Sequence, residues 1–84
     1  MNKSSITLRG VVIPIDWDEN GKVTATALAT PNEDEYAIAV EKKGREFFSI
    51  LQETVEIKGT CKTVGDKKIV LVKDYKIIER RPNR

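Results

Sequence analysis

The stretch "DWDENGKVTATA", residues 16–27, runs from a polar loop into a segment where apolar and polar residues alternate. The loop ends in Asn20-Gly21, a strong short-range signal for a turn between antiparallel strands. The alternation continues through residues 22–29 and predicts a strand. One face carries Val23 and the three alanines of this segment. The other face, which we expect to point outward, carries Lys22, Thr24, Thr26 and Leu28.

Residues 5–15, "SITLRGVVIPI", predict the strand that precedes this loop. Gly10 interrupts its pattern, as a glycine does where a strand bends or bulges. Pro14 lacks an N–H, so it restricts the end of the strand to an edge or a non-bonded position. Residues 30–35 form a second predicted loop, and residues 36–40 a short third strand.

The period changes in residues 43–52, "KGREFFSILQ", where the apolar residues recur at spacings of three and four. This spacing predicts a helix, which at this length is stable only if its apolar face is covered. We therefore expect Phe47, Ile50 and Leu51 to cover one end of the sheet, and both Phe47 and Phe48 to be core residues.

Alternation returns in residues 55–62, "VEIKGTCK", and in residues 68–79, which predict the fourth and fifth strands around a loop at 63–67. Gly59 again lies within a strand. Cys61, the only cysteine, is expected to be a small buried residue.

This order of three strands, a helix and two strands resembles the OB-fold, an all-β, five-stranded Greek-key barrel (β-β-β-α-β-β). The resemblance rests on Gly10 in the first strand, on the helix just before "VEIKGTCK" and on "KKIVLVKDYKII" as the closing strand. It is greatest with small stand-alone bacterial and archaeal OB domains, and with nucleic-acid-binding OB modules that share a "V-x-I-x-G" strand opening. An SH3-like barrel is the alternative, but the helix after the third strand disfavours it.

With 84 residues, 39% hydrophobic and 33% charged, the chain fits a single small domain. We expect this domain at residues 4–79, followed by a basic disordered tail at 80–84. One cysteine permits no internal disulfide, and we identify neither a signal peptide nor a membrane-spanning segment. The expected location is cytoplasmic, the expected state a monomer.

Catalysis is disfavoured because the chain has no histidine, no zinc-type ligand cluster and no glycine-rich phosphate loop. We therefore predict that the protein is not an enzyme and expect no cofactor.

Calcium is an alternative at residues 16–21, because Asp16, Asp18 and Asn20 with Gly21 begin in the manner of an EF-hand loop. That loop also needs a bidentate glutamate at its twelfth position, which is Ala27 here, and helices on both sides. A hairpin turn is the favoured interpretation, and weak calcium binding stays open.

The resemblance to OB-folds implies a ligand surface across the second and third strands, bordered by the first and last loops. Weak binding of single-stranded DNA or RNA is the leading functional prediction, through cations and aromatic rings on that surface. The candidate residues are Arg9, Trp17, Lys22, Thr24, Thr26, Tyr36, Lys67 and Lys68.

Charge supports a second prediction. Residues 1–41 hold three Lys or Arg against seven Asp or Glu, whereas residues 42–84 hold twelve against six. Trp17 lies among Asp16, Asp18 and Glu19, and these carboxylates repel a phosphate backbone. The alternative is therefore a protein-interaction or regulatory module that uses the acidic Trp17 loop.

Overall fold

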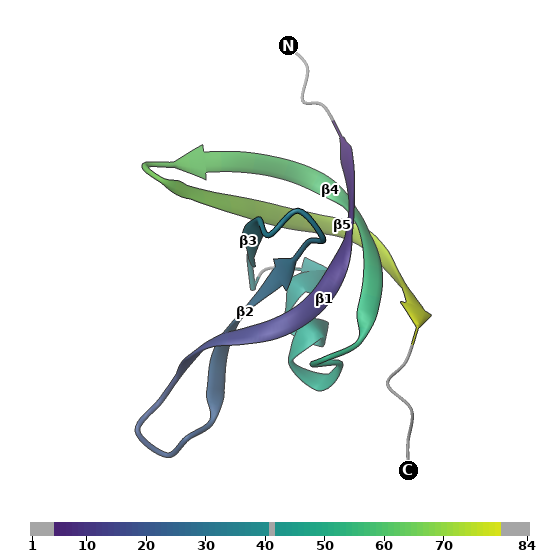
Figure 1. Cartoon of the computed structure of the whole chain (residues 1–84). Coiled ribbons are helices and arrows are strands. Elements are labelled where there is room, and N and C mark those ends of the chain that lie inside the picture. Colours follow the sequence, from purple (N-terminus) through teal and green to yellow (C-terminus); the bar gives the residue numbers. More distant parts are fainter. Residues whose placement is uncertain (1–4, 41, 80–84) are drawn as a thin grey trace.

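The computed structural model describes residues 5–40 and 42–79, which form five strands and one short helix (Figure 1). In chain order the elements are β1 (Ile6–Trp17), β2 (Val23–Ala29), β3 (Glu35–Ile38), the 3-10 helix η1 (Lys42–Ser49), β4 (Thr54–Val64) and β5 (Lys67–Glu79). The prediction of a mostly β chain with one helix between the third and fourth strands is confirmed. The predicted tail at 80–84 and the predicted domain start at residue 4 lie outside the described residues.

All five strands belong to one sheet, which closes into a ring in the order β1-β2-β3-β5-β4. Neighbouring strands are antiparallel, except that β3 and β5 run parallel and share the pairs Ala37↔Ile69 and Ile38↔Val70. A closed sheet leaves a free strand edge only where one strand extends past its neighbour.

β1 is long because it serves two partners, β4 through its first half and β2 through its second. Gly10 lies beside this change of partner, where a Cβ atom would collide with the Ala29 carbonyl oxygen. The predicted bend at Gly10 therefore has a steric cause. The expected end of the strand at residue 15 is wrong: a β-bulge at Ile15 follows Pro14, and pairing continues to Trp17.

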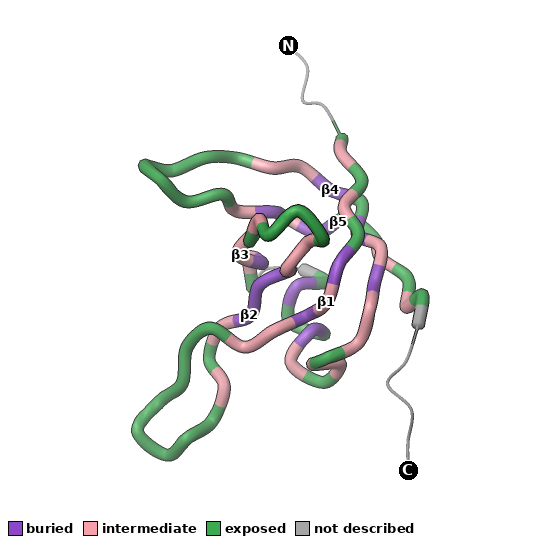
Figure 2. Tube along the Cα trace, in the orientation of Figure 1, coloured by how far each residue is buried: buried purple, intermediate pink, exposed green. Residues whose placement is uncertain are grey.

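The core fills the inside of the ring, with contributions from all five strands and η1 (Figure 2). Its buried residues are Val12, Leu28, Ile38, Phe47, Val55, Ile57, Val70 and Val72. Cys61 is only half-buried, at the position opposite Val70.

The predicted orientation of β2 is wrong for two residues. Leu28 pairs with Val12 and belongs to the core, and Thr26, on the same face, is only 2% exposed. The alternation identified two faces, but the large Leu28 lies inside while the alanine face lies outside. Ala27 on that outer face is nevertheless only 1% exposed.

The helix is shorter and tighter than predicted, eight residues of 3-10 helix in place of 43–52. A Cβ atom at Gly44 would collide with the Ala39 carbonyl oxygen, so the helix starts in close contact with the end of β3. Gln52, at φ 74°, then turns the chain toward β4. No helix among the described residues is both long and apolar enough to cross a membrane.

Of the two phenylalanines in η1, Phe47 is fully buried in the core, as predicted, and Ile50 and Leu51 pack against that core. Phe48 is only half-buried, which corrects its expected core position. Adjacent residues of a 3-10 helix point about 120° apart, so one core cannot accept both rings.

The β4–β5 hairpin is longer than predicted, and the expected loop at 63–67 is a two-residue turn, Gly65-Asp66. Gly65 has φ 62°, as a glycine at the first position of such a turn can. The third strand is shorter than expected, ending at Ile38.

Candidate binding surface

Two hairpins, β1–β2 and β4–β5, extend from the same side of the ring (Figure 1). In the strand order, β2 and β3 are neighbours. β1 of the first hairpin lies on one side of this pair, and β5 of the second hairpin lies on the other. The surface predicted to carry the ligand is therefore bordered by the two hairpins.

A row of directly paired residues crosses the outside of the ring. Ile13 pairs with Ala27, Ala27 with Ala37, Ala37 with Ile69, and Ile69 with Lys62. Each of the four apolar members is next in sequence to a core residue: Val12, Leu28, Ile38 or Val70. Because side chains alternate along a strand, the row points outward. We call these five residues the outer row.

Outward positions beside this row are also apolar where β1 meets β2. Val11 pairs with Ala29, and both are half-buried. Ala25, two residues before Ala27, pairs with Asp16. The second strand thus presents small apolar side chains, and the third presents Ala37 and the exposed Glu35, where a nucleic-acid surface would present cations and aromatic rings.

Trp17 stands at the end of β1, opposite Val23, and is 52% exposed. Its backbone N–H donates to Asp16 Oδ1 at 2.9 Å. Asp16, Asp18 and Glu19 are all exposed. The acidic surroundings of Trp17 that were expected from the sequence are present in the structure.

The β1–β2 turn is built around Asp18. Its Oδ1 accepts the N–H groups of Asn20 at 2.8 Å and Lys22 at 3.0 Å, and its own N–H donates to the Lys22 carbonyl oxygen at 2.9 Å. Gly21 adopts φ 83°, which a glycine tolerates. The hairpin interpretation of residues 16–21 is confirmed. In residues 5–40 and 42–79, no three His, Cys, Asp or Glu side chains are grouped as metal ligands.

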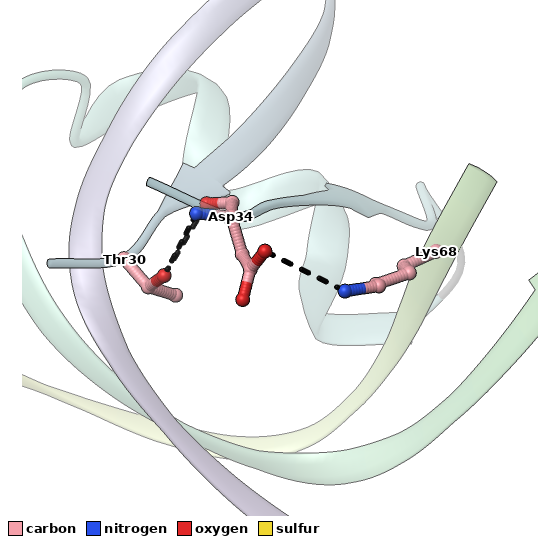
Figure 3. A network of polar contacts seen from close by, with 3 residues as sticks. All are labelled: Thr30, Asp34 and Lys68. Carbon is pink, nitrogen blue, oxygen red and sulfur yellow. Dashed lines mark hydrogen bonds and ion pairs between the residues drawn. The ribbon is translucent and has the colours of Figure 1, made fainter. Parts of the chain in front are cut away.

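Lys68, predicted to contact nucleic acid, belongs to a polar network with Thr30 and Asp34 at the β2–β3 loop (Figure 3), and it lies near Tyr36, which was predicted for the same role. Lys68 Nζ lies 3.6 Å from Asp34 Oδ1 and 5.3 Å from the centre of the Tyr36 ring. Thr30 Oγ1 accepts the Asp34 N–H at 3.3 Å. Tyr36 also packs against the core, which leaves little of its ring for stacking.

Arg9 points outward on β1, four residues before Ile13 of the outer row, in the half of the strand that pairs with β4. It pairs with Glu56 of β4, which pairs with Lys76 of β5. Arg9 Nη2 and Lys76 Nζ lie 3.9 Å and 3.6 Å from Glu56 Oε1. Arg9 also lines a shallow hollow with Val11 and Ala29, at the end of β2, while its guanidinium group approaches Glu56. The expectation that Arg9 borders the surface of the second and third strands therefore stays a prediction.

The other residues predicted to contact nucleic acid also lie on separate parts of the molecule. Thr26 is buried inside the ring, Lys67 stands at the tip of the β4–β5 hairpin, and Lys22 and Thr24 line a groove beside η1. The predicted set does not form one continuous surface.

That groove, of about 640 Å³, lies between the start of β2 and the helix, and sequence reasoning missed it. Its apolar lining comes from Val23, Val40, Phe48 and Leu51, with Lys22 and Arg45 as the charged lining residues. The two consecutive phenylalanines were the available signal, because only one of them can face the core.

On the side of η1 toward β5, Tyr75 fixes the helix. Its hydroxyl donates to Glu46 Oε1 at 2.7 Å, and its ring centre lies 4.6 Å from that of Phe47. The hydrogen bond to Glu46, then burial and the charges of Glu46 and Asp74, raise the pKa of Tyr75 to about 12. Glu46 and Tyr75 thus hold the helix against the ring.

No protein-family model matches the chain, and no curated protein matches it well enough to count as a relative.

Proposed function

We propose that the protein is a non-enzymatic binding module with an OB-fold, which recognises a partner protein through the outer row and Trp17. The ring order β1-β2-β3-β5-β4, the parallel β3–β5 contact and a helix between β3 and β4 support the Greek-key OB assignment. In that fold, ligands bind across the second and third strands.

The observation that carries the choice of a protein partner is the composition of the outer row. Four of its five residues are apolar and only Lys62, at one end, is charged. Trp17, half-exposed beside Val23, adds an aromatic anchor of the kind that dominates protein interfaces. Asp16, Asp18 and Glu19 add negative charge, so the partner segment carries apolar residues with a basic flank.

Selection from a displayed peptide library, followed by titration of the best synthetic peptides, tests this function. Trp17 is the only tryptophan, so its fluorescence reports directly on this surface. We expect Trp17→Ala to weaken the selected peptides at least about tenfold, the effect of losing about 1.4 kcal/mol. Val64→Ala is the matched control, since Val64 is similarly exposed, at 56%, on the other hairpin. Equal binding by both variants would contradict the proposal.

Single-stranded nucleic acid is the second candidate, favoured by the cations of the β4–β5 hairpin. Lys62, Lys67 and Lys73 are exposed there, and none forms an ion pair with another described residue. Binding of labelled oligo(dT) or oligo(rU) at about 50 mM salt that falls steeply by about 200 mM would favour this candidate. We expect no such binding at micromolar protein concentration.

A further inference from the structure

We propose that the groove between β2 and η1 binds an extended acidic peptide segment, which pairs with the free edge of β2 and inserts an apolar side chain beside Phe48. The inference rests on the proposed function in that the partner is a protein, but it uses a surface other than the outer row.

The first argument is the free edge of β2. β3 pairs with β2 only along Thr26–Ala29, so Val23, Thr24 and Ala25 have β1 on one side and no strand among the described residues on the other. Backbone N–H and C=O groups alternate between the two edges of a strand. Part of the backbone of this segment therefore faces the free side, where an extended chain can add as a further strand.

The second argument is the apolar wall of the groove, which begins at the same edge. Val40 is 43% exposed, and Phe48 and Leu51 are half-buried. An apolar side chain of a peptide paired with Val23–Ala25 can lie against these three residues. Burial of one such side chain contributes about 1.5 to 3 kcal/mol, which a short peptide needs in addition to its backbone hydrogen bonds.

The third argument is charge. Lys22, at the start of β2, and Arg45, on η1, line the groove, and none of the other described lining residues is a carboxylate. Neither cation forms an ion pair with another described residue. A carboxylate can accept two parallel hydrogen bonds from a guanidinium group, so acidic residues of a peptide fit this site and basic ones are repelled. The free strand edge favours a polypeptide over a phosphate backbone, which has no amide groups to pair with it.

A displayed library of peptides with about eight randomised residues, selected on the full chain, tests the proposal, and synthetic copies of the enriched peptides serve as probes. We expect a class in which acidic residues accompany an apolar one, and amide resonances of Val23, Thr24 and Ala25 that shift on titration. The double variant Lys22→Glu/Arg45→Glu should weaken these peptides at least about tenfold, because two charge-assisted contacts are lost.

The matched control is Lys67→Glu/Lys73→Glu, which makes the same change of charge on exposed residues of the β4–β5 hairpin. We expect it to leave acidic peptides bound within about twofold, since these charges lie outside the groove. The proposal is overturned if acidic peptides are not enriched, if both double variants weaken them equally, or if the shifted amides lie elsewhere. Phosphate-dependent binding of oligo(dT) at the same amides would also overturn it.

Comparison with Trp17→Ala separates this inference from the proposed function. Peptides that are weakened by Trp17→Ala but not by Lys22→Glu/Arg45→Glu support the outer row and overturn the groove. The opposite pattern supports the groove and overturns the outer row. Peptides weakened by neither variant overturn both.

Discussion

The two outer faces of the ring share β1 but differ in how their side chains are used. On the side of β4 and β5, Arg9, Glu56 and Lys76 form a charged row in which both cations approach one carboxylate. On the side of β2 and β3, the outer row is apolar across four strands. One face pairs its charges internally, whereas the other carries half-buried apolar side chains around the buried Ala27.

This difference allows the same strand to contribute to a charged outer surface and to the surface that we propose for binding. Cross-strand pairs of opposite charge stabilise a sheet and keep it from pairing with other chains. Small apolar residues beside an exposed tryptophan favour contact with another chain, because their burial on binding is favourable. The predictions below test this contrast.

The largest effect is expected from Phe47, on which both faces depend. Phe47→Ala should lower the free energy of unfolding by about 3 to 5 kcal/mol, because a fully buried aromatic ring is replaced by a cavity. Phe48→Ala, in the half-buried groove position, should cost less than half as much. Urea denaturation measures both, and equal losses would contradict the placement of η1.

A charge placed in the outer row should separate the two faces. Ala37→Glu puts a carboxylate at the centre of the apolar row and should weaken selected peptides by about 2 kcal/mol, or about 30-fold. Thr7→Glu places the same residue on the other face, opposite Lys58, and should leave binding unchanged. Similar losses in the two variants would show that the apolar row is not the binding surface.

Tyr75 gives a pH-dependent effect on stability. Its pKa is 10.0 unfolded and about 12 folded, so the folded state favours the neutral phenol. This contribution is fully present below pH 10 and is lost as the pH rises toward about 12. Tyr75→Phe should cost about 1 kcal/mol at pH 8, the value of a typical hydrogen bond.

Thermal unfolding of wild type and Tyr75→Phe at several pH values isolates the contribution of this hydroxyl, because the two proteins differ only there. The stability difference between the two proteins should shrink as the pH rises from 10 to 12. A difference that stays constant over this range would contradict a raised pKa of Tyr75 in the folded state.

The smallest effect belongs to the charged row. Glu56→Gln should lower stability by at most about 1 kcal/mol at low salt, because both contacts are long and both cations are exposed, and such ion pairs contribute little. At about 0.5 M salt the difference from wild type should largely vanish. Calorimetry at the two salt concentrations measures it, and a loss above about 2 kcal/mol would show that this face is more than a solvated ion-pair row.

Local patterns predicted the elements well. Asn20-Gly21 marked the first hairpin, Gly10 the bend in β1, and Phe47 the residue that covers the core. These features depend on short-range geometry or on a single buried side chain. The strand boundaries were less accurate, because the bulge at Ile15 and the two-residue turn at Gly65 extend pairing beyond the alternating segments.

The binding surface was harder to predict, because it depends on which face of each strand the closed ring turns inward. A two-residue period places Leu28 and Ala27 on opposite faces of β2 but does not identify which face points to the core. The prediction that Thr26 points outward was therefore wrong. The partner change of β1 also brings Arg9 beside Glu56 of β4, a pairing that the alternation did not predict. The groove could not be predicted without knowing that the pairing of β3 with β2 stops at Thr26 and leaves Val23 uncovered.

The contrast between the faces is tested most directly by methyl resonances of the full chain during titration with the tightest selected peptide. We expect the methyl groups of Ile13, Ala27, Ala37 and Ile69 to shift, with quenching of Trp17 fluorescence. The methyl group of Thr7, on the face of Arg9, Glu56 and Lys76, should not move. Shifts confined to Thr7 and its neighbours, with the outer row unchanged, would contradict the assignment of the binding surface.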